Sequence, residues 1–119
     1  LAAVHARLQD AVGGCIDAFL HCPHLPDGGH GYGHACTCRK PGAGLLHQAR
    51  ELLGCSFEGS AVVGDSARDV LMARGLPLRT VLVHSGKPMD QEQAALHAAG
   101  VRPDHEARDL GAAVDWLLR

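Results

Sequence analysis

The chain has 119 residues, of which 46% are apolar, 20% charged and 3% aromatic, and its formal net charge is -2. This length and apolar content suit a single domain with a buried core. The small net charge and the few aromatic side chains argue against a nucleic-acid binder or a membrane-surface binder. There is no apolar run long enough for a transmembrane helix and no signal peptide. The first residue is Leu1 rather than Met, so we expect residues 1–119 to form one amino-terminally truncated domain.

Helices and strands are predicted to alternate along the chain. Apolar residues at helical spacing predict helices at residues 1–11, 45–53, 66–74, 90–99 and 110–118, each of the first four followed by glycine. Short apolar runs predict strands at residues 15–20, 60–64 and 79–83. Asp90 and Gln93 resemble a capping box for the fourth helix. This alternation predicts an α/β fold, a partial doubly wound parallel sheet of Rossmann-like type, in which ligands bind at the carboxyl ends of the strands.

Cysteine and histidine concentrate in the loop that follows the first predicted strand. An odd total of five cysteines without a secretory signal disfavours disulfides and favours a metal in a reduced, cytoplasmic compartment. The proposed zinc ligands are Cys22, His24, Cys36 and Cys38. Four protein ligands make a closed tetrahedral site, which is structural rather than catalytic and would order a loop that has no apolar core. The competing candidates are His21, His30 and His34, and Cys15 and Cys55 are expected to be ordinary buried or semi-buried residues.

Two further features predict a site for phosphate and magnesium. Arg39 and Lys40 follow the last zinc ligand directly, and a guanidinium beside an ammonium suits a phosphate group, although such a pair can also be a solvated surface pair. Asp65 follows a buried strand, where a hard carboxylate oxygen suits Mg²⁺. The alternative is that Asp65 only caps the next helix. Asp69 is expected to pair with Arg68 or Lys40 rather than to bind the metal.

Three segments in this order carry a family resemblance: residues 22–24 (Cys-Pro-His), 36–41 (Cys-Thr-Cys-Arg-Lys-Pro) and 64–69 (Gly-Asp-Ser-Ala-Arg-Asp). Together they resemble the zinc-containing phosphatases of the haloacid dehalogenase superfamily. Within it they are most similar to the D-glycero-D-manno-heptose 1,7-bisphosphate 7-phosphatase family, with the histidinol-phosphate phosphatases as near relatives. The resemblance implies a Mg²⁺-dependent phosphomonoesterase that removes the 7-phosphate of the heptose bisphosphate through an aspartyl-phosphate intermediate.

The resemblance also implies roles for individual residues. Lys40 would stabilise the transferring phosphoryl group, Arg39 would bind the substrate and Asp65 would bind Mg²⁺. Ser66 occupies a position where the heptose enzymes often carry a basic residue, and it is a weak candidate for a substrate contact. The zinc-stapled loop 22–38 would cover the substrate. The expected partner is a small phosphorylated metabolite, and we expect a monomer.

The sequence departs from the family in one respect that decides its chemistry. The family's nucleophile belongs to an Asp-x-Asp-Gly-Thr type motif, which does not occur in these 119 residues. Covalent catalysis needs that nucleophile, so we expect this chain to be an inactive fragment. The alternatives are a histidinol-phosphate phosphatase, a non-catalytic zinc-stapled module that binds phosphate, and a purely structural domain.

Overall fold

The computed structural model describes residues 2–18, 20, 42–84 and 88–119, and five helices and three strands lie within these ranges. In chain order the elements are α1 (Ala2–Ala11), α2 (Gly44–Leu53), β1 (Ala61–Gly64), α3 (Ala67–Leu71), β2 (Arg79–Val83), α4 (Met89–Ala98), β3 (His105–Ala107) and α5 (Leu110–Leu117).

The three strands form one parallel sheet in the order β1-β2-β3. In its register Gly64 lies opposite Leu82, and Val83 lies opposite Ala107. Side chains alternate between the two faces of a strand, so Leu82 points to one face and its neighbours Val81 and Val83 point to the other. All three are buried, as expected for a central strand covered on both sides.

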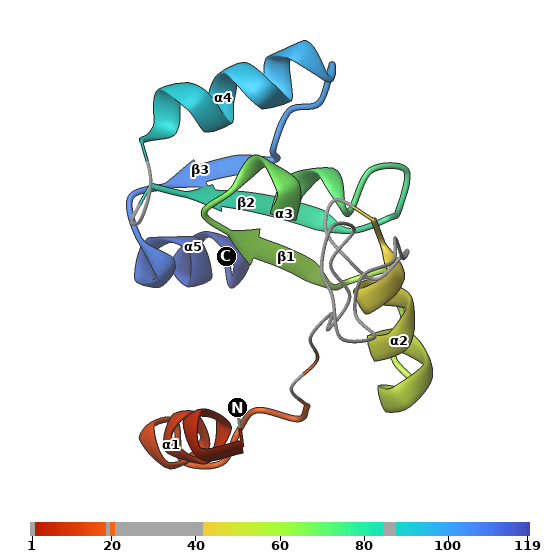
Figure 1. Cartoon of the computed structure of the whole chain (residues 1–119), viewed down its shortest axis with the longest axis vertical. Helices are drawn as coiled ribbons and strands as arrows, with labels where there is room; N and C mark the ends of the chain where they lie inside the picture. Colours follow the sequence, from red (N-terminus) through yellow and green to blue (C-terminus); the bar gives the residue numbers. More distant parts are fainter. Residues whose placement is uncertain (1, 19, 21–41, 85–87) are drawn as a thin grey trace, which may run out of the picture.

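Helices cover both faces of this sheet (Figure 1). On one face, Leu82 packs with Ala67 and Val70 of α3 and with Leu96 of α4. On the other face, Val81 and Val83 pack with Ala107 of β3 and with α5, whose Trp116 also contacts this cluster. The predicted α/β fold with a parallel sheet is therefore confirmed, and the core lies on the two faces of β2.

Each predicted helix has a counterpart in the structure, and glycine marks where several of them end. Gly54 adopts a left-handed conformation directly after α2, with φ of 62°, and Gly100 follows α4 with φ of 70°. A residue with a Cβ disfavours this conformation, so these glycines are suited to end a helix. Within the described residues, no helix has the length and apolar character needed to cross a membrane.

Two local predictions were wrong, and one strand was not predicted. The described residues of the predicted strand 15–20 form no strand, because the side-chain amide of Gln9 donates to the carbonyl of Ile16 and accepts from its N–H at 3.1 Å. The third strand is instead β3, whose His-Glu-Ala sequence has no apolar run. The capping box of Asp90 and Gln93 does not form either, since α4 begins after Pro88 without a side-chain cap.

Candidate functional site

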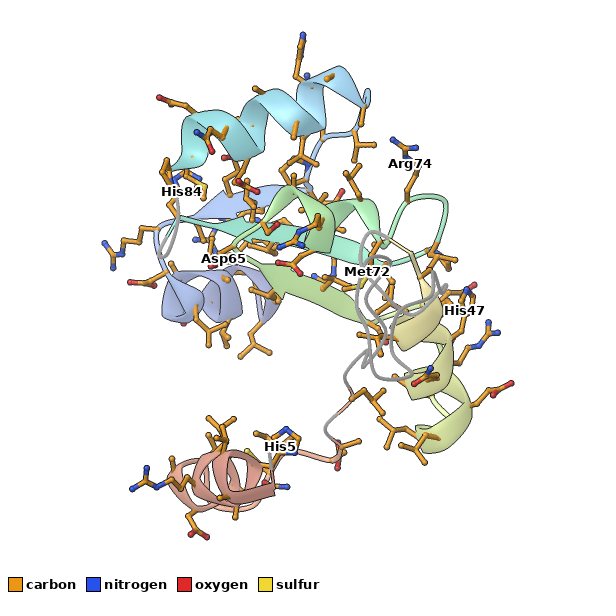
Figure 2. All side chains as sticks on the ribbon, in the orientation of Figure 1. His5, His47, Asp65, Met72, Arg74 and His84 are labelled. Carbon is orange, nitrogen blue, oxygen red and sulfur yellow. The ribbon has the colours of Figure 1, made fainter. Side chains whose placement is uncertain are left out.

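The carboxyl ends of the parallel strands β1 and β2 lie at the same edge of the sheet, and a polar residue follows each of them. Asp65 follows β1 directly, and His84 follows β2 directly. In Figure 2 both residues lie at this edge, whereas Arg74 lies at the opposite edge. The sequence prediction that Asp65 directly follows a strand of a parallel sheet is confirmed.

The segment 64–69 forms a compact turn into α3. Ser66 is the N-cap: its Oγ accepts a hydrogen bond from the backbone N–H of Arg68 at 3.2 Å. In return the backbone N–H of Ser66 donates to Oδ2 of Asp69 at 3.2 Å, which completes a capping box. Gly64 is required here for space, since a Cβ on it would overlap the side chain of Asp69.

These contacts show that Asp65 does not cap α3. The residue that caps α3 is Ser66, so the alternative that Asp65 serves as the cap is wrong. Asp65 is half-buried. A carboxylate oxygen at the carboxyl edge of a sheet is a suitable ligand for a hard cation such as Mg²⁺. Within the described residues, no group of three His, Cys, Asp or Glu side chains is arranged to hold a metal ion.

Asp69 is buried beside Asp65, and its carboxylate belongs to the turn rather than to solvent. Its Oδ2 accepts the Ser66 N–H, and its side chain packs against Gly64. A buried carboxylate that accepts backbone N–H groups near the start of a helix is in a favourable electrostatic position. Asp69 therefore shapes the backbone on both sides of Asp65.

A second acidic group reaches this turn from α4. Oε1 of Glu92 accepts a hydrogen bond from the backbone N–H of Ala67 at 2.8 Å, across 25 residues of sequence. Sequence reasoning missed Glu92, because a glutamate in the first turn of a helix is common and only the packing of α4 on α3 reveals its partner.

A further polar cluster lies where β2 and β3 end. Oε1 of Glu106 lies 2.8 Å from Nε2 of His84 and accepts a hydrogen bond from Nε2 of Gln93 at 2.9 Å. The hydrogen bonds from Gln93 and His84 lower the pKa of Glu106 below its ordinary value, and burial opposes this shift. Gln93 and Glu106 also line a cavity of about 160 Å³ between α4 and β3, which does not include Asp65. The sequence predicted the strand that precedes His84 but none of the contacts in this cluster.

Several predicted site residues lie outside the described residues. These are the four zinc ligands Cys22, His24, Cys36 and Cys38, together with Arg39 and Lys40. The structure therefore describes the proposed magnesium side of the site, and it does not test the zinc loop or the cationic pair. Cys15 and Cys55 are free and exposed, so the prediction that they are buried or semi-buried is wrong.

The sequence of this chain is similar to a family of hydrolases and to individual phosphatases of known name. A HAD-hydrolase-like family model matches residues 37–113. The D-glycero-beta-D-manno-heptose-1,7-bisphosphate 7-phosphatase of Pseudomonas aeruginosa is 42% identical over 90 residues, which are 73% of this chain and 47% of that protein. The D-glycero-D-manno-heptose-1,7-bisphosphate 7-phosphatase of Thermosynechococcus vestitus is 35% identical over 97% of this chain and 62% of its own length.

Two solved phosphatase structures are similar to this chain in fold. The D,D-heptose 1,7-bisphosphate phosphatase of B. bronchiseptica, crystallised with magnesium and phosphate, superposes with a TM-score of 0.73 at 30% identity, over 98% of this chain and 62% of that one. The p-nitrophenyl phosphatase of Archaeoglobus fulgidus superposes with a TM-score of 0.56 at 28% identity, over 65% of this chain and 30% of that one. The chain spans about half to two thirds of the length of the heptose phosphatases it matches. On the family match, the sheet topology and the turn at residues 64–69, the chain belongs to the HAD-like hydrolase family.

Proposed function

We propose that this chain carries the magnesium and substrate side of a phosphomonoesterase site for a sugar phosphate, with the 7-phosphate of D-glycero-D-manno-heptose 1,7-bisphosphate as the target group. The observation that carries the proposal is Asp65, a half-buried carboxylate at the carboxyl end of β1 that takes no part in capping α3. Similarity to heptose bisphosphate phosphatases from several bacteria, and to one crystallised with magnesium and phosphate, supports the same choice.

In this proposal Asp65 supplies one oxygen ligand to Mg²⁺. When bound, Mg²⁺ neutralises charge on the phosphoryl oxygens as the phosphate ester is cleaved. Ser66 and Asp69 hold the backbone on the carboxyl side of Asp65, and the β1-β2 ladder holds it on the other side. The Ser66 hydroxyl accepts one hydrogen bond in the cap and retains its own proton, so a donated bond to substrate is compatible with its position.

Arg39 and Lys40 complete the proposed site as cations for the phosphate group, with Lys40 at the transferring phosphoryl group. Zinc held by Cys22, His24, Cys36 and Cys38 would order the loop 22–38 that precedes them. A reduced cytoplasmic location and a monomeric state remain predictions.

The chain itself is proposed to bind substrate without turning it over. No aspartate among the 119 residues lies in an Asp-x-Asp-Gly-Thr type context, and an aspartyl-phosphate route needs that nucleophile. Binding of Mg²⁺ and phosphate, rather than catalysis, is therefore the property that tests the site.

The experiment is calorimetric titration of the purified chain with Mg²⁺ in the presence of inorganic phosphate. We expect Asp65→Asn to weaken Mg²⁺ binding by about 10-fold or more, since a metal ligand loses its charge. Asp115→Asn is the matched control, because Asp115 is an exposed aspartate on α5, on the other face of the sheet from α3. Equal Mg²⁺ affinity in wild type and Asp65→Asn would overturn the proposal.

Two further measurements address the substrate and the zinc. Titration with heptose 1,7-bisphosphate and with histidinol phosphate should show tighter binding of the heptose; the reverse order would favour the histidinol-phosphate alternative. Elemental analysis should find about one zinc per chain in wild type and little in Cys36→Ala. A folded wild-type chain without zinc would overturn the zinc assignment.

A further inference from the structure

The turn that carries Asp65 has three backbone N–H groups at the start of α3, and each has a partner. The N–H of Arg68 donates to Ser66 Oγ, and the N–H of Asp69 donates to the Ser66 carbonyl at 3.0 Å. Both partners come from within the turn itself. The remaining N–H, that of Ala67, donates to Oε1 of Glu92 at 2.8 Å. Among the hydrogen bonds described for residues 64–69, this one ties the turn to a different helix.

The packing of α4 places the Glu92 carboxylate at this point. Met89, Glu92 and Leu96 lie at spacings of three and four residues, so they share one face of α4. Leu96 is 2% exposed and packs in the cluster that contains Ala67 and Val70 of α3, and Met89 packs against the same cluster. At the far end of the helix pair, Nη2 of Arg74 donates to the carbonyl of Ala99 at 3.0 Å. The packing of Met89 and Leu96 against α3 therefore fixes the part of α4 that carries Glu92 next to the turn.

We propose that Glu92 is a positioning residue for Asp65: its carboxylate accepts the Ala67 N–H and thereby holds the Asp65–Ala67 backbone in the conformation that presents Asp65 to a divalent cation. This inference rests on the proposed function of Asp65 as a magnesium ligand. Asp69 and Ser66 secure the turn from inside, and Glu92 secures it from α4.

The geometry favours a positioning role for Glu92 over a role as metal ligand. Its Oε1 accepts the Ala67 N–H, so this oxygen already has a partner in the turn. A positioning residue acts through the hydrogen bond that it accepts. The amide oxygen of glutamine accepts the same bond, although more weakly than a carboxylate. A role that depends on the negative charge, as in a carboxylate ligand or a long-range electrostatic effect, would in contrast be weakened by glutamine, which keeps an oxygen but loses the charge.

The experiment compares wild type, Glu92→Ala, Glu92→Gln and Gln91→Ala in the full chain. Gln91 is an exposed neighbour on α4 and serves as the control for a change of side chain on this helix. Two quantities are measured below the onset of unfolding: Mg²⁺ affinity in the presence of inorganic phosphate, and the hydrogen-exchange rate of the Ala67 amide by NMR.

For Glu92→Ala we expect an approximately 10-fold or greater loss of Mg²⁺ affinity, typical of residues that orient a metal ligand, and faster exchange of the Ala67 amide. Glu92→Gln should restore the slow exchange and bring the affinity to within about threefold of wild type. Gln91→Ala should match wild type in both measurements. Two results would overturn the inference: unchanged exchange and affinity in Glu92→Ala, or a loss in Glu92→Gln as large as that in Glu92→Ala.

Failure of the proposed function is recognised separately. If wild type binds no Mg²⁺, the magnesium assignment of Asp65 fails. The exchange rates of the Asp65 and Ala67 amides then decide whether Glu92 holds the turn: faster exchange in Glu92→Ala with recovery in Glu92→Gln supports it, and unchanged exchange refutes it.

Discussion

Substitution of Gly64 by alanine tests the close packing of the Asp65 turn. The added Cβ would overlap the side chain of Asp69, so the carboxylate has to move. Overpacking of this kind costs about 1–3 kcal/mol. Displacement of Asp69 also removes the acceptor of the buried Ser66 N–H, which costs about 1–3 kcal/mol more. We therefore expect Gly64→Ala to lower the free energy of unfolding by roughly 2–6 kcal/mol, a large fraction of the stability of a small domain.

The assay is thermal unfolding followed by circular dichroism. At about 4 °C per kcal/mol, Gly64→Ala should lower Tm by roughly 8–24 °C. Gly111→Ala is the matched control, because Gly111 lies in α5 and its added Cβ would meet only Asp109 Oδ1, at an ordinary 3.5 Å. Alanine favours a helix over glycine by about 1 kcal/mol, so this variant should be slightly more stable than wild type. A Tm for Gly64→Ala within about 2 °C of wild type would refute the packing of Asp69 over Gly64.

The remaining predictions concern the cap, the core and the acidic cluster. In urea unfolding, Ser66→Ala should lower the free energy of unfolding by about 1 kcal/mol, because the N-cap is lost. Asp65→Ala should change it by no more than about 0.5 kcal/mol. A larger effect of Asp65→Ala than of Ser66→Ala would mean that Asp65 is the cap. Leu82→Ala should cost about 2–5 kcal/mol, because Leu82 is fully buried between β2 and the α3-α4 layer; a loss below about 1 kcal/mol would contradict this placement. The pKa of Glu106 is lowered in the folded state, so its stabilising contribution is present above its unfolded pKa of about 4.3 and disappears as pH falls through the lower folded value. Tm measured between neutral pH and pH ~3 should therefore fall more steeply in wild type than in Glu106→Gln, and parallel profiles would argue against the bonds from Gln93 and His84.

Much of the fold follows from local sequence pattern. Helical spacing of apolar residues predicted the five helices, and the runs before Asp65 and His84 predicted β1 and β2. The same pattern failed at residues 15–20, where an apolar run of strand-like composition is bonded through Ile16 to the side chain of Gln9. It also missed β3, because His105 and Glu106 carry no apolar signal. That strand depends on its ladder with β2 and on the stacking of the His105 ring on Trp116 at 4.6 Å.

Part of the candidate site was also predictable from the sequence, and part was decided only by the folded structure. The apolar run at residues 60–64 predicted that Asp65 directly follows a strand, and the order of three short motifs indicated the family. The sequence left open whether Asp65 or another residue caps α3, and the hydrogen bonds of the folded turn assign the cap to Ser66. The zinc ligands and the Arg39–Lys40 pair stay predictions from sequence.

The sequence by itself determined the alternation of helices and strands, the position of Asp65 at the ligand-binding edge and the membership of a hydrolase family. The first two properties are encoded by residues a few positions apart, and the third by short motifs and their order along the chain. Only the tertiary structure decided which distant groups support that edge. Glu92 meets Ala67 across 25 residues, and Glu106 meets His84 across 22. Such contacts arise when buried side chains such as Leu96 and Leu82 bring α4 and β3 into register with their neighbours, and this packing has no local signature in the sequence.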